Sequence, residues 1–285
     1  MPETILVIGA DGFVGRRLVR FLLENGHHVL PWRRQDGPLD RVSNGAAISH
    51  VVNVAGRTFV PASWQNPVPF YADNLMTTVE ALHVCRTAGV PLVHLSSYVY
   101  GMPRSLPIRE DHPLEAVNPY AHSKILAESV IEFHRQHMGL VATVIRPFNL
   151  YGPGQPSSFL IPTLVAQFLD DSRPMIQVAD LRPRRDYLHV DDLLVLIVAA
   201  LSSPGGTFNA GSGVSCSVGE LIEQIAAVVG TAKDVEEIGP RRQNEVLDVV
   251  ADTSAARLTL GWQPRIDLTR GLRTVVAALE ATNAS

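Results

Sequence analysis

The sequence has little cysteine, little charge and no basic surplus, and each shortage excludes a class of protein. Two of the 285 residues are cysteines, and Cys85 and Cys216 have the spacing neither of metal ligands nor of a secreted disulfide framework. Charged residues make up 18% of the chain, and the formal net charge is -4. Because phosphate backbones usually attract a basic surplus, we expect no nucleic-acid partner. We also expect no metal site.

Long apolar runs are absent as well. The longest, over residues 193–201, is too short to span a bilayer, so we expect a buried helix and no membrane partner. Residues 1–3 show no basic segment or cleavage pattern of a signal peptide. These features predict a soluble cytoplasmic protein. The hydrophobic content of 46% suffices for one large core, or for a core with a small added lobe.

Strands and helices alternate through the first half of the chain. Apolar runs predict strands at 4–8, 28–32, 50–54, 91–95 and 141–146, with helices at 14–24, 70–87 and 120–138. Strand, helix and strand in succession require parallel pairing with right-handed crossovers. The sequence therefore predicts an α/β fold with a doubly wound parallel sheet over residues 1–150. Residues 35–47 are too few for a full helix and strand, so we expect this connection to be compressed.

The second half of the chain is more irregular. It contains a Gly/Pro-rich stretch at 151–158, helical patterns at 161–169, 191–202, 218–229 and 251–260, and a short strand at 187–190. Ser217 is a plausible N-cap for the third of these helices. We predict that residues 151–285 form mainly a smaller substrate-binding lobe, interleaved with returns to the main sheet near 187–210.

A glycine-rich loop follows the first predicted strand and opens a helix. Gly9 permits a tight turn, Gly12 leaves room for a pyrophosphate, and Gly15 lets the helix pack closely on the sheet. The helix N-terminus offers free amides and a positive dipole end to phosphates. An ordinary glycine-rich turn is the alternative, but this context favours a Rossmann-type dinucleotide site. The predicted cofactor-binding residues of the loop are Gly9, Asp11, Gly12, Phe13, Val14 and Gly15.

The residues after the second strand bear on the choice of cofactor. An acidic residue there usually binds the ribose hydroxyls of NAD, whereas this chain has Arg33 and Arg34. A guanidinium can bind a 2′-phosphate that a carboxylate would repel. We therefore favour NADP over NAD and assign both arginines to the cofactor site. The alternative is that Arg33 is solvated and that Asp36 or Asp40 serves NAD.

Tyr120 and Lys124 are four residues apart on a predicted helix, so they share a face. A free phenol has a pKa of about 10. A nearby ammonium, together with the positive ring of an oxidised nicotinamide, would lower the pKa of Tyr120. Ser96 and Ser97 end the strand at 91–95, where sheets of this kind bind ligands. A serine there could hydrogen-bond the reacting oxygen while Tyr120 transfers the proton.

Together these segments resemble the extended short-chain dehydrogenase/reductases. More narrowly, the chain is similar to the NAD-dependent epimerase/dehydratase family, which modifies nucleotide sugars, with some likeness to GDP-4-keto-6-deoxymannose reductases. The residues that carry the resemblance, besides the Gly9 loop, are 53–56, Asn74, 96–101, 118–124, 146–154, 185–192, 208–211 and 260–262.

The resemblance implies a role for each matching residue. Tyr120 would transfer the proton, with Lys124 as its partner and Ser97, rather than Ser96, completing the triad. Further cofactor contacts would come from Val54, Ala55, Gly56, Asn74, Tyr120, Lys124 and Pro147. Substrate contacts would come from Ser97, Asn149, Arg185, Asn209 and Arg242. Arg185 could instead form a salt bridge with Asp186 or Asp191. The resemblance also implies a homodimer formed through helices such as those at 70–87 and 120–138.

The chain departs from the family's dehydratases. Those enzymes carry an Asp-Glu pair after the catalytic hydroxyl, where this chain has Tyr98 and Val99, so dehydration is disfavoured. With Arg33 favouring NADPH, we expect reduction of the 4-keto group of a nucleotide-activated sugar. The alternatives are a nucleotide-sugar 4-epimerase with tightly bound NAD and, in another class, a non-catalytic Rossmann redox sensor or regulatory binder.

Overall fold

The computed structural model describes residues 2–39, 47–239 and 246–283. Its centre is a six-stranded sheet in the order β2-β1-β3-β4-β5-β9, in which every neighbouring pair is parallel. This arrangement confirms the predicted doubly wound α/β fold. The strands are β1 (Thr4–Ile8), β2 (His28–Trp32), β3 (His50–Asn53), β4 (Leu92–Leu95), β5 (Ala142–Pro147) and β9 (Gly206–Ala210).

The direction of winding reverses at β1. From β1 the chain first adds β2 on one side and then crosses to β3 on the other. In open parallel sheets such a switch point leaves a crevice at the carboxyl ends of the strands, where ligands bind. Within the described residues, the connection from β2 to β3 contains a short 3-10 turn, η1 (Arg34–Asp36), and most of the segment expected to be compressed lies outside them.

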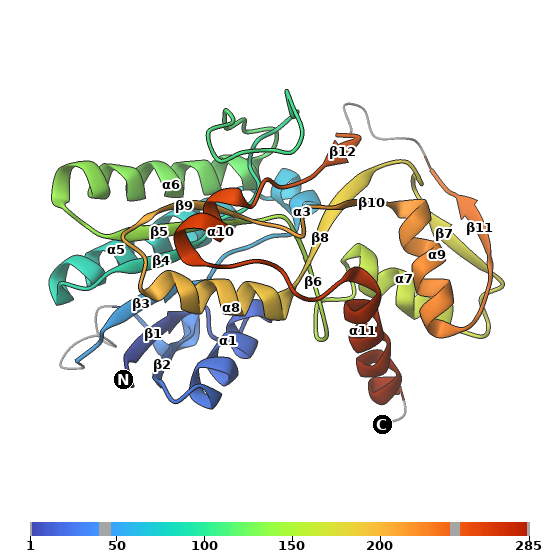
Figure 1. Ribbon diagram of the computed structural model, residues 1–285, viewed down its shortest axis with the longest axis horizontal. Helices are drawn as coiled ribbons and strands as arrows, with labels where there is room; N and C mark the ends of the chain where they lie inside the picture. Colours follow the sequence, from blue (N-terminus) through green and yellow to red (C-terminus); the bar gives the residue numbers. More distant parts are fainter. Residues whose placement is uncertain (1, 40–46, 240–245, 284–285) are drawn as a thin grey trace.

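Helices cover both faces of the sheet (Figure 1). One face carries α1 (Phe13–Glu24) and α8 (Val190–Leu201), and the other carries α5 (Thr77–Ala88) and α6 (Pro119–Met138). Strand β1 shows why both are needed, because residues 5–8 have no exposed surface and alternate between the two cores.

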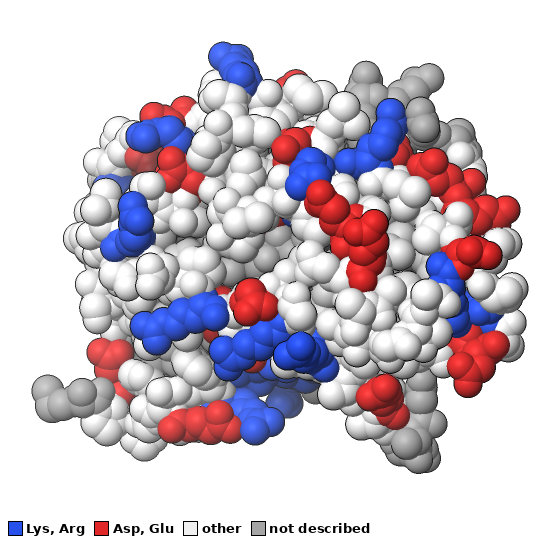
Figure 2. Space-filling model, turned by 45° about the vertical axis from the view of Figure 1, so that its right-hand side comes forward, with Lys and Arg blue, Asp and Glu red and all other residues white. Residues whose placement is uncertain are grey.

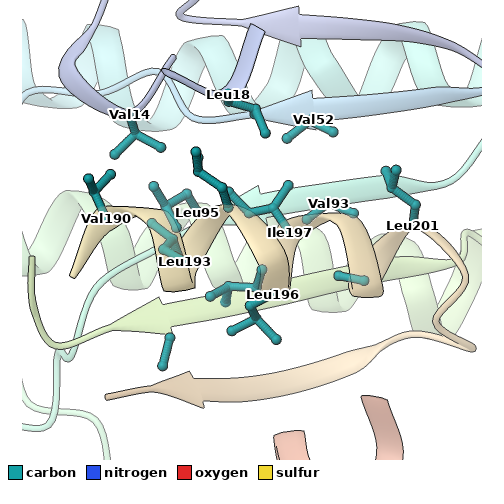
Figure 3. Close-up of a cluster of buried hydrophobic side chains, with 14 of the residues drawn as sticks. Val14, Leu18, Val52, Val93, Leu95, Val190, Leu193, Leu196, Ile197 and Leu201 are labelled. Atoms are coloured by element: carbon teal, nitrogen blue, oxygen red, sulfur yellow. The ribbon is translucent and has the colours of Figure 1, made fainter. Parts of the chain in front are cut away.

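The apolar run predicted to be a buried helix is the C-terminal part of α8. Figure 3 shows this helix packed against the sheet and near α1. Only Val195 of its large apolar residues is substantially exposed, so α8 lies on the core without being enclosed. The residues of this core that are labelled in Figure 3 are Val14, Leu18, Val52, Val93, Leu95, Val190, Leu193, Leu196, Ile197 and Leu201.

The helix predicted at 70–87 is present but is not a uniform α-helix. It is preceded by α3 (Val60–Gln65) and begins as α4 (Val68–Phe70), widens into a π-helical turn, η2 (Tyr71–Met76), and then continues as α5. Single π-helical turns occur often at functional sites. Here the turn buries the consecutive polar residues Asp73 and Asn74.

The smaller lobe lies beyond the carboxyl ends of the main sheet (Figure 1). Its core is formed by α7 (Leu160–Leu169), α9 (Val218–Val229) and α11 (Leu268–Asn283) packed on strands. Ser217 caps α9 as predicted, because its side chain accepts a hydrogen bond from the Glu220 amide. The remaining elements are β6 (Asn149–Tyr151), β7 (Met175–Val178), β8 (Arg184–His189), β10 (Ser215–Ser217), β11 (Asp234–Glu237), β12 (Asp248–Val249) and α10 (Ser254–Leu260).

The surface charges, the helices and the metal-ligating residue types can each be compared with the classes of protein considered from the composition. Basic and acidic side chains are interspersed over the face in Figure 2, with acidic residues over the region of β11. Within the described residues, no helix combines the length and apolar character needed to cross a membrane. The same residues contain no cluster of His, Cys, Asp and Glu that could hold a metal ion.

Candidate active site

The glycine loop forms a tight cradle at the start of α1. A Cβ atom on Gly9, whose φ is 87°, would lie 2.6 Å from the Ala55 Cα, and one on Gly15 would lie 1.9 Å from the Gly9 carbonyl oxygen. Gly12 differs, since its nearest neighbour would be 3.4 Å away, and it precedes α1 without a capping side chain. Gly9 and Gly15 therefore permit close backbone packing. Gly12 leaves room above the first-turn amides, so the loop fits a dinucleotide pyrophosphate.

Tyr120 lies in the first turn of α6. Pro119 opens this helix, and the Asn118 side chain caps it by accepting a hydrogen bond from the Ala121 amide at 2.8 Å. The Tyr120 phenol is hydrogen-bonded to the Ser97 side chain, beyond the carboxyl end of β4. The structure thus brings together two of the three predicted catalytic groups from different elements.

The neighbouring serine has a different environment. Ser96 is buried and its hydroxyl donates to the Glu128 carboxylate. Glu128 also forms a buried ion pair with Arg146 at 2.6 Å. Of the two serines between which the sequence left a choice, Ser97 is therefore the one beside Tyr120, whereas Ser96 belongs to the core.

The lowered pKa expected for Tyr120 depended on Lys124 together with an oxidised nicotinamide, and the protein alone does not produce it. Burial raises the pKa of this phenol to about 12, and the hydrogen bond from Ser97 offsets only part of that rise. Tyr120 is consequently protonated at neutral pH, which suits a group that donates a proton.

Lys124 completes the predicted triad from the next turn of α6. Its ammonium is buried and donates to the Leu95 carbonyl oxygen at 2.7 Å. Burial lowers the pKa of Lys124 to about 8, while the carboxylate of Glu128 acts in the opposite direction. Lys124 therefore remains partly to mostly charged near neutral pH.

Asn74 links the segment after β3 to α6. Its amide group donates to the Ser123 hydroxyl at 2.8 Å and to the Arg57 carbonyl oxygen at 3.2 Å, and its oxygen accepts from the Arg57 amide at 2.8 Å. A Cβ on Gly56 would lie 2.7 Å from that same oxygen. Asn74 therefore fixes the predicted cofactor segment 54–56 against α6, and this geometry gives it a supporting role.

The two arginines after β2 behave differently. Arg33 is exposed, and its backbone amide donates to the Asp36 carboxylate at 2.7 Å. The Arg34 guanidinium instead reaches Asp73, at 2.5 Å. Asp36, one of the acids considered for NAD binding, thus caps the η1 turn, and Asp40 lies outside the described residues.

The substrate-side predictions separate into two groups. Asn149 is partly exposed, accepts from the Tyr98 hydroxyl at 3.4 Å and donates to the Asp186 carbonyl oxygen at 3.3 Å. Asn209 has no exposed surface, and its amide group donates to the Ile108 and Asp252 carbonyl oxygens while its oxygen accepts from Tyr100. We do not include Asn209 in the proposed substrate site. Pro147, at the end of β5, is buried with it.

Arg185 donates to the Val246 carbonyl oxygen at 2.7 Å and to the Arg184 carbonyl oxygen at 2.8 Å. Asp186 is buried and accepts from the Ser212 hydroxyl at 2.7 Å, and Asp191 pairs with Arg17 at 2.7 Å. Both acids considered as partners of Arg185 therefore have other partners. Arg242 lies outside the described residues.

Two residues beside this site were not among the predictions. Arg57 and Asp73 form an ion pair at 2.5 Å next to the predicted cofactor segment. Arg57 directly follows the 53–56 motif, so its position was a usable signal. Nothing local in the sequence distinguishes Asp73 from a solvated helical acid.

The fold and the glycine cradle define an α/β protein that binds a dinucleotide at a sheet switch point. A family model described as the NAD dependent epimerase/dehydratase family matches residues 5–211. The chain belongs to this family, as the sequence resemblance indicated, and is an NAD(P)-dependent enzyme.

Individual relatives cover nearly the whole chain. A UDP-glucose 4-epimerase of Mycolicibacterium smegmatis is 32% identical, over 95% of this chain and 96% of the relative. A GDP-6-deoxy-D-mannose reductase of Pseudomonas aeruginosa is 30% identical, over 99% of this chain and 98% of the relative. Among solved structures, RMD from Pseudomonas aeruginosa complexed with NADPH is 28% identical with a TM-score of 0.88, covering 98% of this chain and 99% of that one.

Proposed function

We propose that this enzyme reduces the 4-keto group of a nucleotide-activated sugar with NADPH. The nicotinamide would supply the hydride. Tyr120 donates the proton to the carbonyl oxygen, Ser97 hydrogen-bonds that same oxygen, and Lys124 stabilises the phenolate left behind. A non-catalytic sensor would have no need of all three of these side chains.

The basic end of β2 carries the choice of NADPH and hence of reduction. Arg34 is placed there by an ion pair with Asp73, and no described acid occupies the position after β2 that would bind the ribose hydroxyls of NAD. An enzyme that exchanges its cofactor after each turnover commonly uses NADPH, whereas an epimerase returns the hydride to the same sugar. The NADPH bound by a similar reductase supports the same choice.

The substrate would extend from Tyr120 into the smaller lobe, formed mainly by residues 151–285. Asn149 and Arg185 lie on adjacent, paired strands β6 and β8. Ser97 and Arg242 complete our proposed set of substrate contacts. Amide and guanidinium donors suit a nucleotide diphosphate. Relatives that act on UDP- and GDP-linked sugars support this substrate class.

A test of the reaction uses the purified chain with NADPH or NADH and a panel of 4-keto nucleotide sugars. We expect oxidation of NADPH, followed by the absorbance of the reduced cofactor, and slower oxidation of NADH. A 4-epimerase is the second candidate, favoured by the UDP-glucose 4-epimerases among the relatives. Epimerisation of an unoxidised sugar nucleotide by protein purified with bound NAD, with no NADPH consumption, would establish that candidate instead.

The role of Tyr120 has its own test. Tyr120→Phe should lower turnover about 100- to 10,000-fold, the usual contribution of a positioned proton donor, with unchanged affinity for NADPH. Tyr71→Phe is a matched control, because it removes a nearby phenol hydroxyl that contacts His122 at 3.0 Å. Survival of turnover in Tyr120→Phe would show that another group transfers the proton.

A further inference from the structure

Two arginines that follow different strands meet at one carboxylate, that of Asp73. Arg34 contacts one oxygen of Asp73 and Arg57 contacts the other, each at 2.5 Å. The separation of the two guanidinium groups is therefore limited to the width of one carboxylate and the two contacts to it. Two cations at this spacing can bind different oxygens of one phosphate.

The strand order explains why these residues meet. Arg34 follows β2 and Arg57 follows β3, and these strands are the two neighbours of β1 in the sheet. Because β1 ends in the Gly9 loop, the arginines approach each other across the edge where a dinucleotide would bind. The two arginines therefore reach Asp73 from the strands on either side of β1.

The π-helical turn η2 holds this arrangement in place. Two adjacent buried residues of η2 both bind Arg57. Asp73 accepts a hydrogen bond from the Arg57 guanidinium, and Asn74 accepts one from the Arg57 backbone amide. Asn74 is in turn bonded to Ser123 on the catalytic helix. Arg57 is therefore held at a defined position and does not extend freely into solvent.

The carboxylate and the guanidinium groups differ in accessibility. The Asp73 side chain is 12% exposed, whereas those of Arg34 and Arg57 are 67% and 48% exposed. A guanidinium has five N–H donors, and the contact with Asp73 uses only part of that capacity. Both arginines therefore keep donors for an incoming anion while Asp73 fixes their spacing.

We propose that Arg57, held beside Arg34 by Asp73, is a second cationic ligand for the 2′-phosphate of NADP and a determinant of cofactor specificity. The proposal rests on the NADP use proposed above. A 2′-phosphate gives both guanidinium groups a charged, multidentate acceptor. The 2′-hydroxyl of NAD carries no charge and gives the pair no such acceptor.

The test measures binding to the full chain by titration calorimetry, with 2′,5′-adenosine bisphosphate and 5′-AMP as probes that differ only in the 2′-phosphate. Arg57→Met should weaken the bisphosphate about 10- to 100-fold, as expected for loss of a charge-assisted hydrogen bond, and leave AMP within about twofold. Arg34→Met should do the same. Both arginines bind the same phosphate and the same carboxylate, so their effects should not be independent. We expect the loss of bisphosphate affinity in the double variant to differ from the product of the two single losses.

Controls and contrary outcomes separate the possibilities. Arg86→Met on α5 removes the same charge from an exposed position elsewhere and should change neither affinity. Thermal unfolding of each variant checks that it is folded, and Arg57→Lys should recover part of the bisphosphate affinity. Equal weakening of both probes by Arg57→Met, or no weakening of the bisphosphate, would overturn the proposal. A wild-type chain that binds AMP as tightly as the bisphosphate would instead refute NADP use itself.

Discussion

At the scale of single residues, burial sets the protonation of Tyr120 and Lys124, the proposed catalytic pair. Tyr120 has a pKa of about 12 and is therefore neutral at physiological pH, whereas the pKa of Lys124 is lowered to about 8, close to neutral pH. Both shifts come mainly from loss of solvent, which disfavours the charged form of each group. At neutral pH, Tyr120 therefore carries a proton that it could donate and Lys124 is mostly charged. Lys124 loses its charge in mild alkali.

We expect kcat/KM to fall as pH rises above about 8, because Lys124 then loses the charge that stabilises the Tyr120 phenolate. The fall follows because deprotonation removes the positive charge of Lys124, and the lowered pKa sets the pH at which it begins. The ratio kcat/KM reports the ionisation of the free enzyme. The measurement is a pH series of initial rates. Lys124→Arg keeps a permanent cation, so whatever activity it retains should not show this decline. An unchanged kcat/KM up to pH of about 10 in the wild type would contradict the role given to Lys124.

At the scale of secondary-structure elements, one buried ion pair joins three segments around the proposed catalytic residues. Glu128 of α6 binds Arg146 of β5 and accepts a hydrogen bond from Ser96, which follows β4. Arg146 also donates to Tyr100 at 2.9 Å. This pair fixes the helix that carries Tyr120 and Lys124 against the strand end that carries Ser97.

Glu128→Gln should lower the free energy of unfolding by about 3–5 kcal/mol, because it leaves the buried guanidinium of Arg146 without its counter-charge. Urea denaturation at neutral pH provides the measurement. Glu132→Gln is the matched control on the same helix, since Glu132 pairs with Arg135 and its side chain is 47% exposed. Its loss should be at most about 1 kcal/mol. Equal losses for the two variants would show that Glu128–Arg146 has no special structural weight.

At the scale of the whole molecule, helices α5 and α6 lie side by side on one face of the sheet (Figure 1). Phe133 on α6 and Met76 next to α5 are each 51% exposed. Large apolar side chains on an outer face favour association, and the family resemblance implies a dimer through these helices. We propose that the chain forms a homodimer in this way.

Light scattering coupled to size exclusion should give about twice the chain mass of 31.0 kDa. Phe133→Glu should shift the protein toward the monomer, because a buried unpaired charge opposes an apolar interface. Leu258→Glu tests the same change at an exposed apolar residue of α10 and should leave the dimer intact. A wild-type monomer, or a Phe133→Glu dimer of unchanged stability, would rule out this interface.

The sequence was informative where local periodicity or steric requirement decides the structure. The apolar strand at 4–8, the Ser217 cap and the packing of Gly15 against Gly9 all follow from residues close in sequence, and the structure has each of them. The shared helical face of Tyr120 and Lys124 follows from the helical repeat in the same way. The π-helical turn could not be predicted, because a helical pattern at 70–87 does not show where the backbone widens.

Taken by itself, the sequence determined the first five strands of the main sheet, its doubly wound class and the residue types available for dinucleotide chemistry. Only the tertiary structure decided which serine faces Tyr120, that Asn209 is enclosed, and that Arg57 and Arg34 share Asp73. It also showed that burial raises the pKa of Tyr120 in the protein alone. The physical reason is that burial and long-range pairing depend on segments brought together by the sheet, whereas sequence patterns record only local propensity and spacing.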